Sequence, residues 1–182
     1  MLFDLETTGF FSPDNEVIEI SAVKVRKGKI VDEFSELVNP CRKIPWQASQ
    51  VNNIMDDMVA KSPTFDIVLK RFIKFIGEDV LVGHNIASFD MKFIYRDCEK
   101  YFKKTISNNY IDTLTLAKIC FPNWKNRKLS DLADYYGIST DGEHRALIDC
   151  KINQEVFELL GKEMKCQNKI SSSNNIGYIS YS

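Results

Sequence analysis

The sequence lacks the marks of a membrane-spanning or secreted chain. No apolar run comes near the roughly eighteen residues that a transmembrane helix needs. The apolar N-terminal stretch is interrupted by Asp4 and Glu6 and has no basic region before it, so we expect no signal peptide. The five cysteines are odd in number and never form a C-x-x-C pair, which favours reduced thiols without disulfide bonds or a zinc site. These absences predict a cytoplasmic protein.

An excess of positive charge is also missing. The 182 residues include 24 Lys and Arg against 25 Asp and Glu, which gives a formal net charge of −1. This balance gives no sign of a broad basic surface for nucleic acid or for membranes. It is compatible with a site that holds only the end of a nucleic acid, where metal ions supply the positive charge. With 44% hydrophobic residues, the chain is long enough for one globular domain with a substantial core.

The apolar periodicity predicts an α/β fold. Strand character over residues 1–9, 17–25 and 30–38 predicts a three-stranded antiparallel meander. Later segments alternate helical spacing with short strands, which favours a mixed sheet with helices on its faces. The predicted helices cover 47–53, 62–76, 89–102, 113–120, 130–136 and 145–164, and the predicted later strands cover 80–83 and 110–111.

Two regions of different composition follow from this assignment. Residues 1–164 carry all the predicted helices and strands and form one domain. Residues 165–182 are rich in Ser, Asn and Lys, so we expect a disordered C-terminal tail there.

Two carboxylates lie two residues apart in the first predicted strand. In a strand, Asp4 and Glu6 point to one face, while Phe3 and Leu5 point to the other. Adjacent carboxylates on a half-buried strand repel each other, and the repulsion grows as water is removed. A divalent cation would neutralise them. The alternative is an edge strand with a solvated acidic face.

Two further acidic positions follow later elements. Asp90 lies in the first turn of a helix after the strand 80–83, where the helix dipole alone could account for an acid. However, loops at the carboxyl ends of central strands carry sites in α/β proteins. Asp149 lies in the second turn of the last helix, and His144 directly precedes that helix. A loop histidine beside metal-bound water could act as a general base, because its pKa is close to neutral; the alternative is an ordinary surface histidine.

Four carboxylates and one histidine from three distant segments thus form one candidate constellation. Its members are Asp4, Glu6, Asp90, His144 and Asp149. All-oxygen ligands favour Mg²⁺ or Mn²⁺ over zinc. Two such ions about 3.5–4 Å apart form the clamp used for phosphodiester hydrolysis, in which one activates water and the other steadies the leaving oxygen.

With these motifs the chain resembles the DnaQ-like 3′–5′ exonucleases of the DEDDh group, which includes the epsilon proofreading subunit and the PolC exonuclease domain of bacterial DNA polymerase III. The matching motifs are FDLETTG at 3–9, GHNIASFD at 83–90 and HRALID at 144–149, supported by IDTL at 111–114. They occur in the family's order over residues 1–164. The resemblance implies an RNase H-like fold, in which a mixed five-stranded sheet has helices on both faces, and two-metal hydrolysis.

The resemblance also implies roles for individual residues. Asp4, Glu6 and Asp149 would hold the first metal ion. Asp4 would bridge to the second ion, which Asp90 would support, and His144 would deprotonate the attacking water. The implied contacts to the terminal nucleotide are Thr7, Thr8, Val51, Ile54 and Phe89.

Three functions fit this set of residues. The first is a metal-dependent 3′–5′ exonuclease of proofreading or repair type, whose partners would be a single-stranded or frayed DNA 3′ end and a DNA polymerase subunit. The second is an exoribonuclease or oligoribonuclease of the same fold. The third is a non-catalytic polymerase accessory or nucleic-acid-binding module, against which the intact constellation argues. The chain length and the meander resemble the polymerase-associated branch, so DNA is favoured over RNA.

Other polar residues near the motifs have structural interpretations. Asp112 is predicted to cap the helix that follows it. His84 is predicted to be a structural hydrogen-bonding group rather than a metal ligand. Lys125, Arg127 and Lys128 are predicted to form a solvated surface loop, although such a loop could contact a phosphate backbone.

Overall fold

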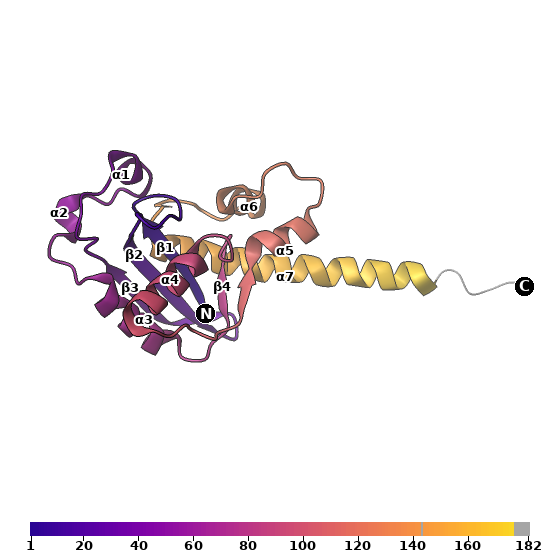
Figure 1. The fold of residues 1–182 in the computed structure, drawn as a ribbon. Coiled ribbons are helices and arrows are strands. Elements are labelled where there is room, and N and C mark those ends of the chain that lie inside the picture. Colours follow the sequence, from indigo (N-terminus) through magenta and orange to yellow (C-terminus); the bar gives the residue numbers. More distant parts are fainter. Residues whose placement is uncertain (143, 177–182) are drawn as a thin grey trace, which may run out of the picture.

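One mixed sheet forms the centre of the molecule (Figure 1). The computed structural model describes residues 1–142 and 144–176, with side chains up to residue 166. The five strands have the order β3-β2-β1-β4-β5, and β1 pairs antiparallel with β2 and parallel with β4. The strands are β1 (Leu2–Thr7), β2 (Val17–Arg26), β3 (Lys29–Leu37), β4 (Leu81–Gly83) and β5 (Tyr110–Asp112). The predicted meander and mixed sheet are confirmed, and β1 lies in the middle.

Helices cover both faces of this sheet, as predicted. They are α1 (Trp46–Asn52), α2 (Asp56–Val59), α3 (Phe65–Ile76), α4 (Asp90–Phe102), α5 (Thr113–Cys120), α6 (Leu129–Tyr136) and α7 (Ala146–Ile176). Phe3 and Leu5 of β1 lie in a core with α3 and α4, whereas Leu2 shares a smaller core with Cys150 of α7. The two faces of β1 are therefore divided as the period of two predicts, and Asp4 and Glu6 point toward α7.

The hairpin between β2 and β3 is set by its turn residues. Lys27 and Gly28 both have positive φ, at 52° and 75°. Two-residue turns of this kind match the twist of the flanking strands, and glycine adopts positive φ without steric cost. This turn connects the second and third strands of the predicted meander.

One helix start and one short helix differ from the prediction. The helix predicted over residues 62–76 begins at Phe65, with Thr64 as its N-cap. The reason is a long-range contact: Asn39 donates its N–H to the Pro63 carbonyl at 2.9 Å and forms a parallel bridge with Thr64, which is extended. The short helix α2 was also absent from the prediction.

The last helix is longer than its pattern predicts. The expected end near Met164 is too early, because α7 continues to Ile176. Extending an existing helix costs much less than nucleating one, so a well-anchored first half can support a weak second half. Residues 177–182 lie outside the described part of the chain, and the division into a domain at 1–164 and a tail stays a prediction. Within the described residues, no helix combines the length and hydropathy needed to cross a bilayer.

An aromatic cluster packs against the face of β1 that is covered by α3. Phe72 of α3 is fully buried, and its ring centroid lies 5.3 Å from that of Phe3 and 5.9 Å from that of Phe34. Phe3 is the direct neighbour of Asp4, so this packing fixes the strand that carries the first acid.

Truncation of this cluster is expected to be costly. Phe72→Ala should lower the free energy of unfolding by about 3–5 kcal/mol, because it removes buried area and leaves a cavity. Urea denaturation at neutral pH measures the change. The matched control is Ile67→Ala on the same helix, where the side chain is 45% exposed. Equal, small losses in both variants would contradict the assigned core.

Candidate active site

Three carboxylates meet on the α7 side of β1. One oxygen each from Asp4, Glu6 and Asp149 can be chosen so that all three lie within 4.8 Å of one another. Asp4 and Glu6 come from adjacent same-face positions of β1, and Asp149 comes from the first turn of α7. The structure therefore brings together the three acids that the resemblance assigns to the first metal ion.

A buried glutamate that our sequence reasoning missed anchors the start of α7. Glu19 of β2 is 2% exposed and lies opposite Glu6 in the strand register. Its carboxylate accepts hydrogen bonds from the Arg145 guanidinium at 2.7 and 3.1 Å and from the Ala146 N–H at 3.1 Å. These bonds fix the helix start and so place Asp149 beside β1. An acid within the apolar strand 17–25 was the available signal.

Asp90 is the first residue of α4, and its carboxylate contacts the backbone of β1. It is 2% exposed, and its Oδ1 accepts the Leu5 N–H at 3.1 Å, which ties the start of α4 to β1. Asp90 is near enough to Asp4 for their charges to repel, although it is outside the set of three close oxygens. The N-cap of α4 is Phe89, which makes no side-chain cap hydrogen bond.

Asp112 holds the loop that delivers Asp90. Its carboxylate accepts the Leu114 N–H at 2.9 Å, which confirms the predicted N-cap. It also accepts the N–H groups of Asn85 at 2.9 Å and Ala87 at 3.3 Å, a role that the sequence did not indicate. A single carboxylate thus joins the loop after β4 to the start of α5.

His144 lies at the rim of the acid cluster. It is exposed, and it lines a pocket of about 190 Å³ together with Asp4, Asp149 and Lys128. Its backbone N–H donates to Asp149 Oδ2 at 3.1 Å, and its φ of 66° turns the chain into α7. The predicted base therefore shares a pocket with two of the predicted metal ligands.

His84 lines the same pocket in a structural role. Its Nδ1 lies 3.1 Å from the Thr113 hydroxyl, and burial lowers the pKa of the imidazole. This agrees with the interpretation of His84 as a hydrogen-bonding group.

An apolar pocket of about 390 Å³ adjoins the acids. Four of the five predicted nucleotide contacts line it, namely Thr7, Thr8, Val51 and Phe89. Ile54 does not, because it is fully buried in a separate core with Ile18, Ile44 and Val59. Asn53 ends α1 with a φ of 57°, and the chain then turns inward to place Ile54 in that core.

Asn52 also lines the pocket and was missed by the sequence reasoning. Its amide donates to the Thr7 carbonyl at 3.4 Å and hydrogen-bonds the Glu6 carboxylate. It thus connects the pocket wall with the acid cluster.

Burial and mutual repulsion raise the pKa values of the clustered acids. Burial, and then repulsion from Asp90 and Glu6, raises the pKa of Asp4 well above its usual range. Burial, and then Asp149 and Glu19, raises the pKa of Glu6 to about 8, and burial raises the pKa of Asp90 to about 7. Such a cluster of oxygen donors fits a hard divalent cation, which would remove the repulsion.

Cys150 directly follows Asp149 but does not join the site. The thiol is buried and donates to the Ser21 carbonyl at 3.4 Å, and burial raises its pKa well above the usual value. It packs against the sheet.

Comparison with known proteins agrees with this geometry. Residues 1–157 match the RNase T exonuclease family. The chain belongs to this family. It is 42% identical over 165 residues to the PolC-type DNA polymerase III of Clostridium perfringens, which covers 91% of this chain and 11% of that protein. It is 37% identical over 164 residues to the DNA polymerase III epsilon subunit of Aquifex aeolicus, which covers 90% of this chain and 81% of that subunit.

The DnaQ-like resemblance is thereby confirmed. The chain spans about a tenth of the length of its PolC-type relatives. Among solved structures, exonuclease X in complex with 5′ overhanging duplex DNA matches with a TM-score of 0.68 and 28% identity over 87% of this chain and 89% of that one. Exonuclease I matches with a TM-score of 0.80 and 16% identity over 88% and 40%, which confirms the RNase H-like fold.

The raised pKa of Glu6 predicts a pH-dependent stability of the exonuclease domain without metal. The folded state binds the Glu6 proton more tightly than the unfolded chain does. The free energy of unfolding therefore falls as the pH rises from 4.5 toward about 8. Glu6→Gln should raise the free energy of unfolding by about 1–3 kcal/mol above this window and change it little below the window.

Urea denaturation in EDTA at the two ends of this range measures the effect. The control is Glu78→Gln, which removes an exposed carboxylate between α3 and β4. At high pH, Mn²⁺ at a hundred times its Kd for the wild type should raise the free energy of unfolding of the wild type by about 2.7 kcal/mol. The same Mn²⁺ concentration should raise the free energy of unfolding of the Gln variant less. A pH-independent effect of Glu6→Gln would contradict the assigned repulsion.

Proposed function

We propose that this domain is a metal-dependent 3′–5′ exonuclease that removes nucleotides from DNA 3′ ends by a two-metal mechanism. The observation that carries the proposal is the position of the acid cluster, which lies between the apolar pocket and His144. DNA is favoured because the similar proteins are DNA polymerase III components and an exonuclease solved with DNA. A polymerase subunit as partner and a cytoplasmic location stay predictions.

The acids divide into two groups for two Mg²⁺ or Mn²⁺ ions. Asp4, Glu6 and Asp149 would hold one ion, and Asp90 with Asp4 would support the other. When bound, such ions make a coordinated water more acidic and stabilise the charge on the leaving oxygen. Oxygen-only donors suit these cations better than zinc.

The apolar pocket would hold the terminal nucleotide. Phe89 and Val51 offer apolar surface to a base. The Thr7 hydroxyl donates to the Gly9 carbonyl at 2.7 Å, and the Thr8 hydroxyl donates to Asn15 at 3.1 Å. Both hydroxyls are thus engaged within the protein, so these residues would meet a nucleotide mainly through backbone and methyl groups.

His144 would accept the proton of the attacking water. An imidazole has a pKa near neutral and exchanges protons readily with solvent when it is exposed. The hydrogen bond from its backbone N–H to Asp149 fixes the turn on which the ring is mounted.

The proposal predicts metal-dependent loss of DNA from its 3′ end. We expect 5′-labelled single-stranded DNA to shorten in Mg²⁺ or Mn²⁺ faster than RNA of the same sequence, and EDTA to stop both reactions. Asp4→Asn should reduce cleavage to background. The matched control Asp32→Asn, an exposed position on β3, should cleave normally. Faster loss of RNA would favour the exoribonuclease, and no metal-dependent loss of either would contradict catalysis.

The role of His144 needs a variant that keeps its backbone. Asparagine tolerates positive φ better than alanine, so His144→Asn preserves the turn and the N–H bond to Asp149. We expect kcat to fall by about 10²–10⁴-fold, as on loss of a general base, with little change in Mn²⁺ affinity measured by calorimetry. A matching loss of Mn²⁺ affinity would mean that His144 is a ligand instead.

A further inference from the structure

A second, basic pocket adjoins the candidate active site. It has a volume of about 370 Å³, and its cationic lining consists of Lys118, Lys125, Arg127 and Lys128. It shares His84, Lys128 and Leu129 with the pocket of Asp4, His144 and Asp149. No carboxylate side chain lines it. A group of four cationic side chains therefore lies next to the acid cluster.

The lysines of this pocket are available to a ligand. Lys118, Lys125 and Lys128 are exposed, and none of the ion pairs seen in the described part of the chain uses their ammonium groups. Two acids that flank this region of the chain accept backbone hydrogen bonds. Asp131 accepts the backbone N–H of Lys128 at 2.8 Å, and Asp112 accepts three backbone N–H groups.

The loop that carries these lysines is held in place. The Arg127 guanidinium donates to the Phe121 carbonyl at 2.6 and 2.9 Å and to the Pro122 carbonyl at 2.7 Å. The His84 ring hydrogen-bonds the Arg127 backbone as well as the Thr113 hydroxyl. A preorganised loop loses less conformational entropy when it binds a ligand. Arg127 thus positions the pocket, while the lysines remain for binding.

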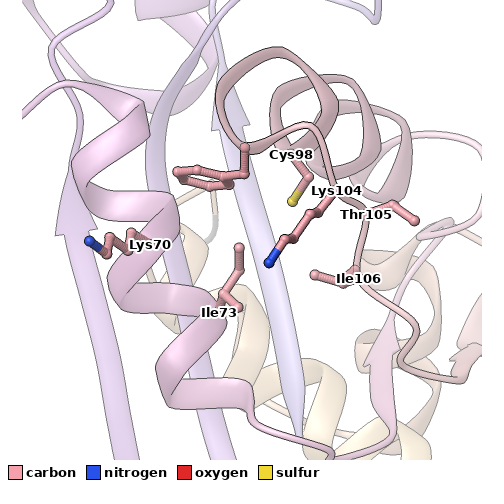
Figure 2. Close-up of a pocket in the computed structure, with 7 residues that line it drawn as sticks. Lys70, Ile73, Cys98, Lys104, Thr105 and Ile106 are labelled. Carbon is pink, nitrogen blue, oxygen red and sulfur yellow. The ribbon is translucent and has the colours of Figure 1, made fainter.

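Another pocket with two lysines has a different chemical character. Figure 2 shows Lys70 and Ile73 on α3, Cys98 on α4, and Lys104 and Ile106 nearby. Its floor is apolar and contains a buried thiol, whose pKa burial raises to about 11. It lies at the end of α4 opposite Asp90, which is about 18 Å away along the helix at 1.5 Å per residue. This pocket shares no lining residue with the pocket of Asp4, His144 and Asp149.

The three pockets around β1 form a series. The apolar pocket includes Glu6, the next pocket includes Asp4, and the basic pocket follows through Lys128. A strand whose terminal base lies in the first pocket would present a phosphate to the acids and a further phosphate to the lysines. We propose that the basic pocket binds a backbone phosphate of the substrate strand beyond the scissile bond. This inference rests on the proposed exonuclease function and names how the rest of the strand is held.

Direct binding tests the proposal without requiring catalysis. Anisotropy of a labelled single strand of about twelve nucleotides is measured in EDTA over a range of salt. For single strands, log K falls by about 0.7 per phosphate contact for each unit of log[salt]. One contact therefore contributes about fivefold to the affinity at 0.1 M salt, relative to 1 M salt. K118A/K125A should remove this one phosphate contact, and so weaken binding by about fivefold and reduce the salt slope by about 0.7. The matched control K70A/K104A should bind as the wild type does.

Substrate length separates binding at this pocket from a general defect. In Mg²⁺, K118A/K125A should raise KM for the longer strand relative to KM for a dinucleotide, whose single phosphate belongs at the acids. Wild-type affinity and salt slope in the variant would overturn the proposal, and so would equal losses on both lengths. A wild type that binds the strand with the expected lysine dependence but cleaves nothing would contradict the proposed function and leave this binding site supported.

Discussion

Mutual repulsion among the carboxylates around β1 is the constraint on which the rest of the structure depends. Asp4, Glu6 and Asp149 bring oxygens within 4.8 Å of one another, and the raised pKa values of Asp4 and Glu6 record the cost. The fold balances this cost elsewhere. The Phe3–Phe72 contact buries the opposite face of the strand, and the Asp90–Leu5 hydrogen bond ties a helix to its backbone. The folded domain thus holds carboxylate oxygens together in an arrangement that could hold a metal ion.

Glu19 adds to the repulsion on Asp4 and Glu6, and it also anchors the start of a helix. Its carboxylate is neutralised by Arg145 and used to hold the first residue of α7. Removing one partner of such a buried pair usually costs more than the pair itself contributes. The anchor therefore matters chiefly for placement: the helix cannot shift along the sheet without leaving a buried charge behind, so Asp149 stays in register with Glu6.

The sequence reached the architecture through local periods, and it reached the acid constellation through the motifs of the family that it resembles. Alternation along residues 2–7 is enough to place Asp4 and Glu6 on one face. What failed depends on contacts between distant segments. The start of α3 is set by Asn39 bonding the Pro63 carbonyl, and Ile54 is buried because Asn53 turns the chain inward. The Glu19 anchor becomes visible only when the register of β1 with β2 is known.

The burial of Cys150 has a consequence for metal discrimination. A thiol that follows a proposed metal ligand such as Asp149 could recruit zinc or another thiophilic ion, which would bind tightly and exchange slowly. Here the sulfur is directed into the sheet, donates to the Ser21 carbonyl and stays protonated at neutral pH. At the proposed site, soft metals would thus find the same oxygen ligands as Mg²⁺ and gain nothing from the neighbouring sulfur. One buried side chain would leave only hard oxygen ligands at the site.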